Sequence, residues 1–330
     1  MKAKVVNDLM QDPLLYIEFD DISDRILFDC GYMFGLTLRE IQKISSVFIS
    51  HTHFDHFMGF DHLLRMCIEQ DRTVEFYGPK DFINQIVGKL SGYSWNLCDD
   101  LNLNFKCFEI SPPLIKSTLL KAKNAFKIES IEEKEFEPCI KKGNGYSVYT
   151  TVMDHKIPSL AFSIKADDFL KVNSSLFENL NIKPGSWLGN LIRKVENNEK
   201  LSEDIDFGNG ILYSEEFLAE NLLYLEKGKK ISYVVDTALT DKTFKDGVEL
   251  IKDSDELYCE CAFLSKDLEK AQNTYHLTAE QAGMLANHGN VKKLFPIHLS
   301  KRYNGIYRDI FDEVIKEFPN VLNAYNKKKK

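Results

Sequence analysis

Four side chains that can bind a metal ion lie close together near the start of the sequence. Directly after an apolar run come His51, His53, Asp55 and His56. The alternating first pair can face one ion, whereas the second pair, turning into a following helix, can face a neighbouring ion. The alternative is a polar surface turn, which is disfavoured because such a cluster is costly without a metal. Gly59 then permits close packing of the backbone.

Three further candidate ligands share one local setting. His155, Asp236 and His298 each follow an apolar run with the pattern of a β-strand. Taken singly, a histidine after a strand is often an ordinary loop residue, and an aspartate there is often a helix cap. Because all three follow strand ends, we expect them to converge with the first cluster on one edge of a sheet.

The elements that must position these residues alternate along the chain. Strand patterns are predicted at residues 14–19, 25–30, 46–50, 73–77, 104–110, 147–152, 161–165, 230–235, 256–263 and 293–297. Helical patterns are predicted at residues 57–70, 80–90, 278–288 and 307–318. This alternation indicates an α/β layered fold. The pattern lapses between residues 167 and 230, which predicts one domain over 1–330 with an inserted arm-like segment at 166–229.

Composition limits the classes of function. The net charge of −8 repels nucleic acid overall, so an RNA substrate would need a local basic surface or metal ions. The scattered cysteines favour reduced, buried thiols over a disulfide framework. No signal peptide or membrane-spanning stretch is recognisable, and a soluble, cytoplasmic protein without membrane association is expected. The basic tail Lys327–Lys330 is interpreted as a solvated chain end.

Several motifs together resemble the metallo-β-lactamase superfamily, and most specifically its ribonuclease Z branch. Besides the first cluster, the matching motifs are LFDCG at 27–31, HKIPSL at 155–160, VDT at 235–237, HLTAEQA at 276–282 and HLSKRY at 298–303. The resemblance implies a four-layer αβ/βα sandwich. It also implies a homodimer whose arms grip a tRNA precursor, and cleavage that leaves a 3′-hydroxyl and a 5′-phosphate.

The same resemblance implies which residues bind two metal ions. It assigns the first ion to His51, His53 and His155, the second ion to Asp55, His56 and His298, and a bridging position to Asp236. Two zinc ions are expected, although manganese or iron also suit such ligands. Two cations roughly 3.5–4 Å apart lower the pKa of a water molecule and stabilise the attacking and leaving oxygens at phosphorus.

Further residues are candidates for proton transfer and substrate binding. Asp55 is expected to orient the attacking hydroxide, and His276 to protonate the leaving alkoxide. Glu260 lies inside an apolar strand pattern and matches the family's partner for that histidine, unless the strand is an edge strand facing water. Ser300 and Arg302 are candidate phosphate contacts, with a surface salt bridge as the alternative role of Arg302.

Three departures from the family pattern leave the substrate open. Cys259 replaces a motif histidine, and no glycine-rich loop is recognisable between Lys4 and Leu15. The segment 165–204 holds six basic and seven acidic side chains, which grip phosphates weakly. The first hypothesis is therefore a tRNA-processing endoribonuclease, the second a hydrolase of a small phosphodiester or another ester, and the third a non-catalytic scaffold that binds nucleic acid or protein.

Overall fold

A computed structural model describes residues 1–208 and 210–323. The basic tail Lys327–Lys330 lies outside these residues. Two compact units are present: one combines Met1–Lys165 with the chain from Lys229 onward, and the other is Ala166–Gly228. In the described part of the chain, no helix has both the length and the apolar character needed to cross a membrane.

The larger unit begins with an eight-stranded sheet in which the strands follow chain order. Its strands are β1 (Lys2–Val5), β2 (Leu15–Glu18), β3 (Arg25–Phe28), β4 (Ile44–Phe48), β5 (Arg72–Pro79), β6 (Leu103–Ser111), β7 (Leu114–Lys121) and β8 (Glu132–Glu135). Pairing is parallel from β3 to β6 and antiparallel elsewhere in this sheet. The parallel strands place several carboxyl ends on one edge.

The second sheet of this unit has six strands. In spatial order they are β18 (Leu294–Ile297), β17 (Glu256–Glu260), β16 (Lys230–Val234), β11 (Pro158–Ala166), β10 (Tyr146–Asp154) and β9 (Cys139–Gly143). The strands β16, β17 and β18 are parallel, so their carboxyl ends also share one edge.

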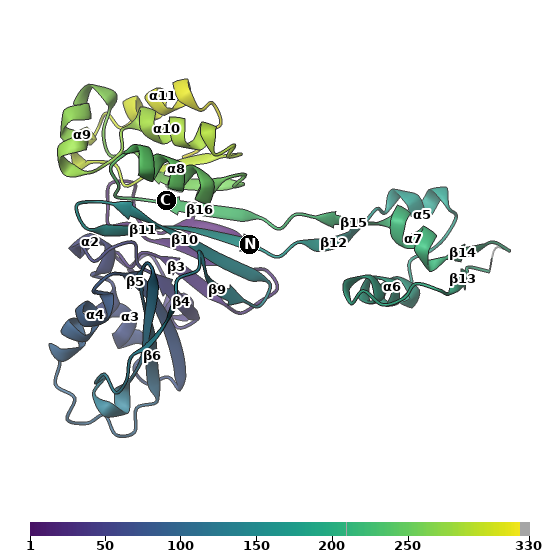
Figure 1. The fold of residues 1–330 in the computed structure, drawn as a ribbon, viewed down its shortest axis with the longest axis horizontal. Coiled ribbons are helices and arrows are strands. Elements are labelled where there is room, and N and C mark those ends of the chain that lie inside the picture. Colours follow the sequence, from purple (N-terminus) through teal and green to yellow (C-terminus); the bar gives the residue numbers. More distant parts are fainter. Residues whose placement is uncertain (209, 324–330) are drawn as a thin grey trace. The chain divides into compact units, whose positions relative to one another are not determined.

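Helices cover the outer faces of the two sheets (Figure 1). On the first sheet lie α1 (Leu38–Ile41), α2 (Phe54–Phe57), α3 (Phe60–Cys67) and α4 (Phe82–Ser91). On the second sheet lie α8 (Asp241–Ile251) and α10 (Ala279–His288), with α11 (Arg308–Glu317) packed on α10 and α9 (Leu268–Thr274) beside them. The expected helix over 57–70 is shorter than predicted, because α2 ends at Phe57 and α3 begins at Phe60.

Two apolar cores hold these layers together. Between the sheets, Phe28 of β3 stacks on Phe162 of β11 with ring centroids 5.3 Å apart. Between the first sheet and its helices, Phe60 packs edge-on against Phe76 with centroids 5.6 Å apart. A sheet that is apolar on both faces requires cover on each side, which confirms the αβ/βα layering expected from the sequence.

The smaller unit is inserted between β11 and β16. It contains β12 (Phe169–Val172), α5 (Ser175–Asn179), α6 (Ser186–Glu196), β13 (Asp204–Asp206), β14 (Leu212–Ser214), α7 (Glu215–Leu222) and β15 (Leu223–Glu226). The antiparallel strands β12 and β15 pair at the two ends of the insertion. Ile182, Leu191, Leu218 and Leu222 form a small buried core. Its action as a substrate-gripping arm stays a prediction.

Candidate metal centre

The candidate ligands leave their strands at the carboxyl ends of the two sheets. His155 directly follows β10, Asp236 lies two residues after β16, and His298 directly follows β18. Asp236 and His298 have φ values of 49° and 52°. This left-handed conformation is unfavourable for residues with a side chain, and such strain is characteristic of functional sites. The sharp turns bring both side chains to the sheet edge.

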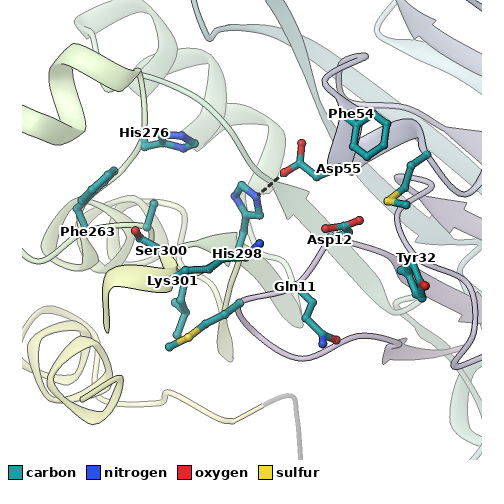
Figure 2. Close-up of a pocket in the computed structure, with 14 residues that line it drawn as sticks. Gln11, Asp12, Tyr32, Phe54, Asp55, Phe263, His276, His298, Ser300 and Lys301 are labelled. Carbon is teal, nitrogen blue, oxygen red and sulfur yellow. Dashed lines mark hydrogen bonds and ion pairs between the residues drawn. The ribbon is translucent and has the colours of Figure 1, made fainter. Parts of the chain in front are cut away.

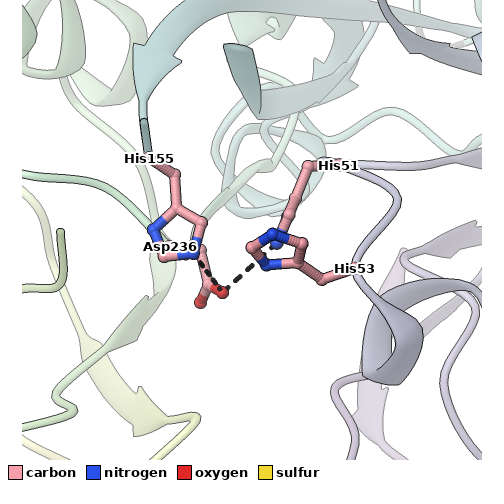
Figure 3. A group of neighbouring side chains, drawn as sticks. All are labelled: His51, His53, His155 and Asp236. Atoms are coloured by element: carbon pink, nitrogen blue, oxygen red, sulfur yellow. Dashed lines mark ion pairs between the residues drawn. The ribbon is translucent and has the colours of Figure 1, made fainter. Parts of the chain in front are cut away.

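A first group of ligand atoms comes from His51, His53, His155 and Asp236 (Figure 3), and these atoms all lie within 4.8 Å of one another. The Nε2 atoms of His51 and His155 each lie 3.5 Å from Oδ2 of Asp236. The ring of His53 is exposed and lies 4.4 Å from the ring of His51. The sequence placed these residues in one group, and their side chains do face one another.

A second group comes from Asp55, His56 and His298. Oδ2 of Asp55 lies 3.6 Å from Nε2 of His56 and 3.4 Å from Nε2 of His298. His56 Nε2 also lies 3.3 Å from the same Asp236 oxygen that faces the first group. The carboxylate of Asp236 thus stands between the two groups, in the position expected for a bridging ligand.

These atoms fit metal ions in two respects. Ligand atoms about 2.0–2.2 Å from a tetrahedral zinc ion lie about 3.3–3.6 Å apart, which matches the separations just given. The buried Nε2 atoms of His51 and His56 make no hydrogen bond within the described chain, although they face Oδ2 of Asp236 at 3.5 and 3.3 Å. Buried polar atoms without hydrogen bonds are costly, so these atoms are suited to sharing a cation.

The protonation of His51 agrees with this interpretation. Its side chain is fully buried, and burial together with the neighbouring His56 lowers the pKa of His51 to about 2. A neutral imidazole is the form that binds a metal ion. The pKa of His56 is shifted in the opposite direction. Burial lowers it, but the carboxylates of Asp29 and Asp236 outweigh burial and raise it to about 10. A cation near Nε2 would take the place of that proton.

Asp29 is a residue whose role the sequence reasoning missed. Its buried carboxylate accepts hydrogen bonds from Ser50 N at 2.7 Å and from Tyr233 Oη at 2.7 Å, and it lies 2.7 Å from His56 Nδ1. Contacts of this kind fix the ring of a metal-binding histidine and its tautomer. The available signal was a carboxylate directly after the apolar strand β3, in the LFDCG motif.

In two other histidines of the site, the ring nitrogen that points away from Asp236 also has a partner. Nδ1 of His51 lies 3.1 Å from Ser50 Oγ, and Nδ1 of His155 lies 2.7 Å from the carbonyl oxygen of Tyr275. Each contact leaves Nε2 directed at Asp236. The ring of His51 is therefore oriented by its neighbour in the sequence, and the ring of His155 by a residue from a distant part of the chain.

His276 and Glu260 form a pair beside the two groups. Nδ1 of His276 lies 2.7 Å from Oε2 of Glu260, whose other oxygen accepts from Thr237 N at 2.8 Å. Glu260 is fully buried on β17, which lies between β16 and β18, so the water-facing edge strand is excluded. Burial opposes the charged imidazole, but the Glu260 carboxylate raises the pKa of His276 above its ordinary value. His276 precedes α10 rather than beginning it.

Cys259 does not enter the site. It is fully buried in the apolar core, and successive residues of a strand point to opposite faces. Since Glu260 faces His276, the cysteine that replaces the family's histidine faces away from this pair.

A cavity of about 830 Å³ opens beside the two groups (Figure 2). Its wall includes Asp55, His276 and His298, together with Ser300 and Lys301. The segment between β1 and β2, where no glycine-rich loop is recognisable, contributes Gln11 and Asp12.

Arg302 is not among the residues that line this cavity in the described chain. Its Nη1 lies 2.8 Å from Oδ1 of Asp267, and its guanidinium lies over the Phe263 ring at 5.7 Å. The salt-bridge alternative thus accounts for its position. Lys301, which the sequence reasoning did not select, is the neighbouring cation at the cavity.

The chain is similar in sequence to known proteins. Residues 14–157 match the family model described as anti-Pycsar protein Apyc1. A ribonuclease Z from Clostridium perfringens is 30% identical over 294 residues, covering 85% of this chain and 81% of the relative. The chain belongs to the ribonuclease Z family. Another ribonuclease Z, from Deinococcus radiodurans, is 26% identical over 310 residues, covering 92% of this chain and 91% of the relative.

Solved structures agree with the fold of this ribonuclease Z family member. The metallo-β-lactamase fold protein YhfI from Bacillus subtilis has a TM-score of 0.57 at 15% identity, covering 97% of this chain and 95% of its own. The short form of human tRNase Z has a TM-score of 0.51 at 18% identity, covering 92% and 91%. The metallo-β-lactamase fold expected from the sequence is confirmed, and the chain is a metal-dependent hydrolase.

Proposed function

We propose that this ribonuclease Z family member is an endoribonuclease that trims the 3′ end of tRNA precursors. The cut leaves a 3′-hydroxyl on the upstream product and a 5′-phosphate on the downstream product. The observation that carries the proposal is the pair of ligand groups joined at Asp236, beside a cavity that also holds His276. The names of the relatives, ribonuclease Z and human tRNase Z, supply the substrate class.

Two zinc ions are the proposed metals. His51, His53 and His155 would hold one, Asp55, His56 and His298 the other, and Asp236 both. When bound, such a pair of cations lowers the pKa of a water molecule and stabilises charge on the phosphate oxygens. Manganese or iron suit the same nitrogen and oxygen ligands, so the metal content decides between them.

The protein side chains then orient the reactants and move protons. Asp55 lies at the cavity and would accept a hydrogen bond from the attacking water, which fixes the direction of attack. The bond between phosphorus and the 3′-oxygen breaks, and the leaving oxygen takes a proton from Nε2 of His276. Glu260 holds the opposite nitrogen, Nδ1, and so stabilises the protonated ring. His276 is therefore the proposed general acid and Glu260 its positioning partner.

Contacts to the substrate phosphate are proposed for Ser300 and Lys301. Both line the cavity beside His298, and a hydroxyl and an ammonium group are ordinary phosphate ligands. Arg302 is assigned instead to hold Asp267, because their ion pair occupies its guanidinium. Lys301→Ala should weaken RNA binding with little change in metal content.

The inserted unit is a weak candidate for gripping phosphates by charge. Residues 166–228 contain twelve acidic and six basic side chains. Three of its cations are paired internally: Lys171 with Glu226, Arg193 with Glu199, and Lys194 with Glu215. Any contact between this unit and RNA would therefore depend on shape and apolar groups more than on electrostatic attraction.

One side-by-side assay tests the proposal. The purified protein is incubated with a tRNA precursor and with a chromogenic phosphodiester, each with and without a chelator. We expect cleavage of the precursor at the 3′ end of the tRNA, lost with chelator and restored by zinc. Metal-dependent cleavage of the chromogenic ester alone would support the second candidate, and no cleavage of either would support a scaffold.

The second candidate function is hydrolysis of a small phosphodiester. The specific observation in its favour is the cavity of about 830 Å³, which lies within the range of small-molecule sites, about 300–1,000 Å³. A net charge of −8 also offers RNA no general attraction. Relative specificity constants on the two substrates distinguish these functions.

The assembly and location are also proposals. We propose a homodimer, as the family resemblance implies, and a location in the cytoplasm. Light scattering of the zinc-loaded protein tests the mass of the assembly, and fractionation of the producing cells tests the location. A monomer at micromolar concentration would remove the dimer from the proposal.

A further inference from the structure

Aromatic side chains stand exposed at one end of the cavity. Tyr32 is 45% exposed, Phe34 is 70% exposed and Phe54 is 78% exposed. Folding favours burial of such rings, so exposed neighbours of this kind are candidates for binding. Tyr32 and Phe54 line the cavity, and Phe34 lies behind Tyr32 with ring centroids 4.6 Å apart. We call Tyr32 and Phe54 the aromatic rim.

The aromatic rim lies across the site from the proposed acid. In Figure 2, Tyr32 and Phe54 lie on one side of the ion pair between Asp55 and His298, and His276 lies on the other. The rim and the acid therefore face different parts of a substrate bound between them.

Hydrogen bonds fix the backbone at both residues. Phe54 is the first residue of α2, and its carbonyl oxygen accepts a hydrogen bond from Met58 N at 2.9 Å. The carbonyl oxygen of Tyr32 accepts from the buried Asn7 side chain at 2.8 Å. Little backbone freedom is lost when a ligand contacts such residues, which favours binding.

The chemistry of the proposed cleavage assigns a nucleotide to each side. His276 protonates the leaving 3′-oxygen, so the upstream nucleotide lies on the side of His276. The phosphate stays on the 5′-oxygen of the downstream nucleotide. Because that oxygen and the leaving 3′-oxygen are bonded to phosphorus at different positions, the downstream nucleotide extends away from His276. The aromatic rim lies on that side of the cavity.

We propose that Phe54, assisted by Tyr32, stacks on the base immediately downstream of the cleaved bond. This inference rests on the proposed function. Stacking of bases on aromatic side chains is a general mode of binding single-stranded nucleic acid. A second cavity of about 410 Å³ begins at Phe54 and is lined by Thr52, Gln85 and Lys89, which leaves room for the next sugar and phosphate to extend.

Equilibrium binding tests the subsite without RNA cleavage. Adenosine 5′-monophosphate and ribose 5-phosphate share the phosphate and sugar and differ only in the base. We expect the zinc-loaded protein to bind the nucleotide about 5- to 100-fold more tightly, as expected for one stacked base. Phe54→Ala should remove this preference, whereas Phe54→Trp should keep it. Leu97→Ala, at an 87% exposed residue outside the cavity, is the matched control and should keep it too.

Cleavage supplies the second test. Two RNA precursors are compared that differ only in having a base or an abasic sugar at the first downstream position. Phe54→Ala should slow cleavage of the base-bearing RNA by about 5-fold or more and leave the abasic RNA unaffected. Equal defects on both RNAs, or no base preference in the wild-type binding assay, would overturn the stacking subsite. A protein that shows the base preference but cuts no precursor would keep the subsite and overturn the RNA-processing function.

Discussion

Asp236 is the residue on which both groups of ligand atoms depend. Its Oδ2 lies 3.5 Å from His51 Nε2 and 3.3 Å from His56 Nε2, atoms that belong to different groups. We expect about two metal ions per chain in the wild type. Asp236→Ala should release both and leave less than one, as measured by elemental analysis after reconstitution with zinc. His288→Ala, remote from both groups, should keep the wild-type content; unchanged content in Asp236→Ala would contradict the bridging role.

His276→Ala should reduce turnover on RNA by about 10²–10⁴-fold, the usual contribution of a general acid. Its metal content should stay unchanged, because His276 Nδ1 is occupied by Glu260 and the ring lies outside the proposed ligand set. Glu260→Gln should cause a milder loss, since the donor remains while the charge that stabilises it is removed. Steady-state kinetics and elemental analysis measure both quantities.

The leaving group gives a control for that prediction. Nitrophenolate leaves without a proton, so the defect of His276→Ala should shrink on a nitrophenyl phosphodiester. A ribose 3′-oxygen needs the proton and should show the full defect. Equal losses on the two substrates, or loss of metal together with activity, would remove His276 as the acid.

Asp29→Asn should weaken zinc binding by about 10–100-fold, as is usual for residues that orient a metal-binding histidine. The reason is the 2.7 Å contact between the Asp29 carboxylate and Nδ1 of His56. Competition with a chromophoric chelator measures the affinity. Asp20→Asn, at a surface ion pair with Lys2, is the control. A zinc affinity equal to that of the wild type would mean that Asp29 stabilises the fold and does not affect zinc binding.

At the scale of elements, parallel pairing gathers the candidate site residues. β16, β17 and β18 are neighbours in register, with Val234 beside Cys259 and Glu260 beside Ile297. Asp236, Glu260 and His298 consequently leave the same sheet edge. The inserted unit is stabilised differently from the larger unit, by a small apolar core and a few charged contacts.

Glu215 of that unit gives an element-scale prediction. Its buried carboxylate accepts from Lys194 Nζ at 2.7 Å and from Ser202 N at 3.2 Å. Burial disfavours its charge, but these donors hold the pKa of Glu215 below its ordinary value. Its stabilising contribution is therefore present above the ordinary pKa of a glutamate and is lost as the pH falls through the lowered value.

Glu215→Gln should make the inserted unit open more readily at neutral pH, and the difference from wild type should vanish in acid. Hydrogen exchange of the Ser202 and Glu203 amides measures this opening. Glu216→Gln on the same helix, without a hydrogen bond to those amides, is the matched control. Faster exchange in Glu215→Gln that persists at low pH would point to a packing defect instead.

At the scale of the whole molecule, charge governs how RNA approaches. The net charge is −8, and Lys301 is the lysine among the described residues that line the cavity. With one lysine and the metal centre engaging about two phosphates, affinity for precursor should fall less than about tenfold between 50 and 200 mM salt. Filter binding of uncleaved precursor in catalytically impaired His276→Ala measures this slope. A loss near 10³-fold would reveal a larger basic surface that contacts RNA.

The sequence by itself determined the candidate ligands and the class of fold. Four of the ligand candidates lie within six consecutive positions, and the others follow apolar strands, so residue type and local period were sufficient to select them. The strands and helices of the larger unit were predicted to within a few residues, except at β1, β7, β8, β9, α1, α8 and α9. The elements of the insertion were not predicted, because their polar and apolar residues follow no clear period.

Only the tertiary structure decided which distant groups meet. His56 is held by Asp29 and His155 by the Tyr275 carbonyl oxygen, because strand order and turns at the sheet edge bring separate segments together. Arg302 pairs with Asp267 while Lys301 lines the cavity, a choice that depends on the direction of side chains in a short turn. Exposure of Phe54 is likewise invisible in a sequence, since an aromatic residue beside a helix start is buried or exposed according to what packs over it.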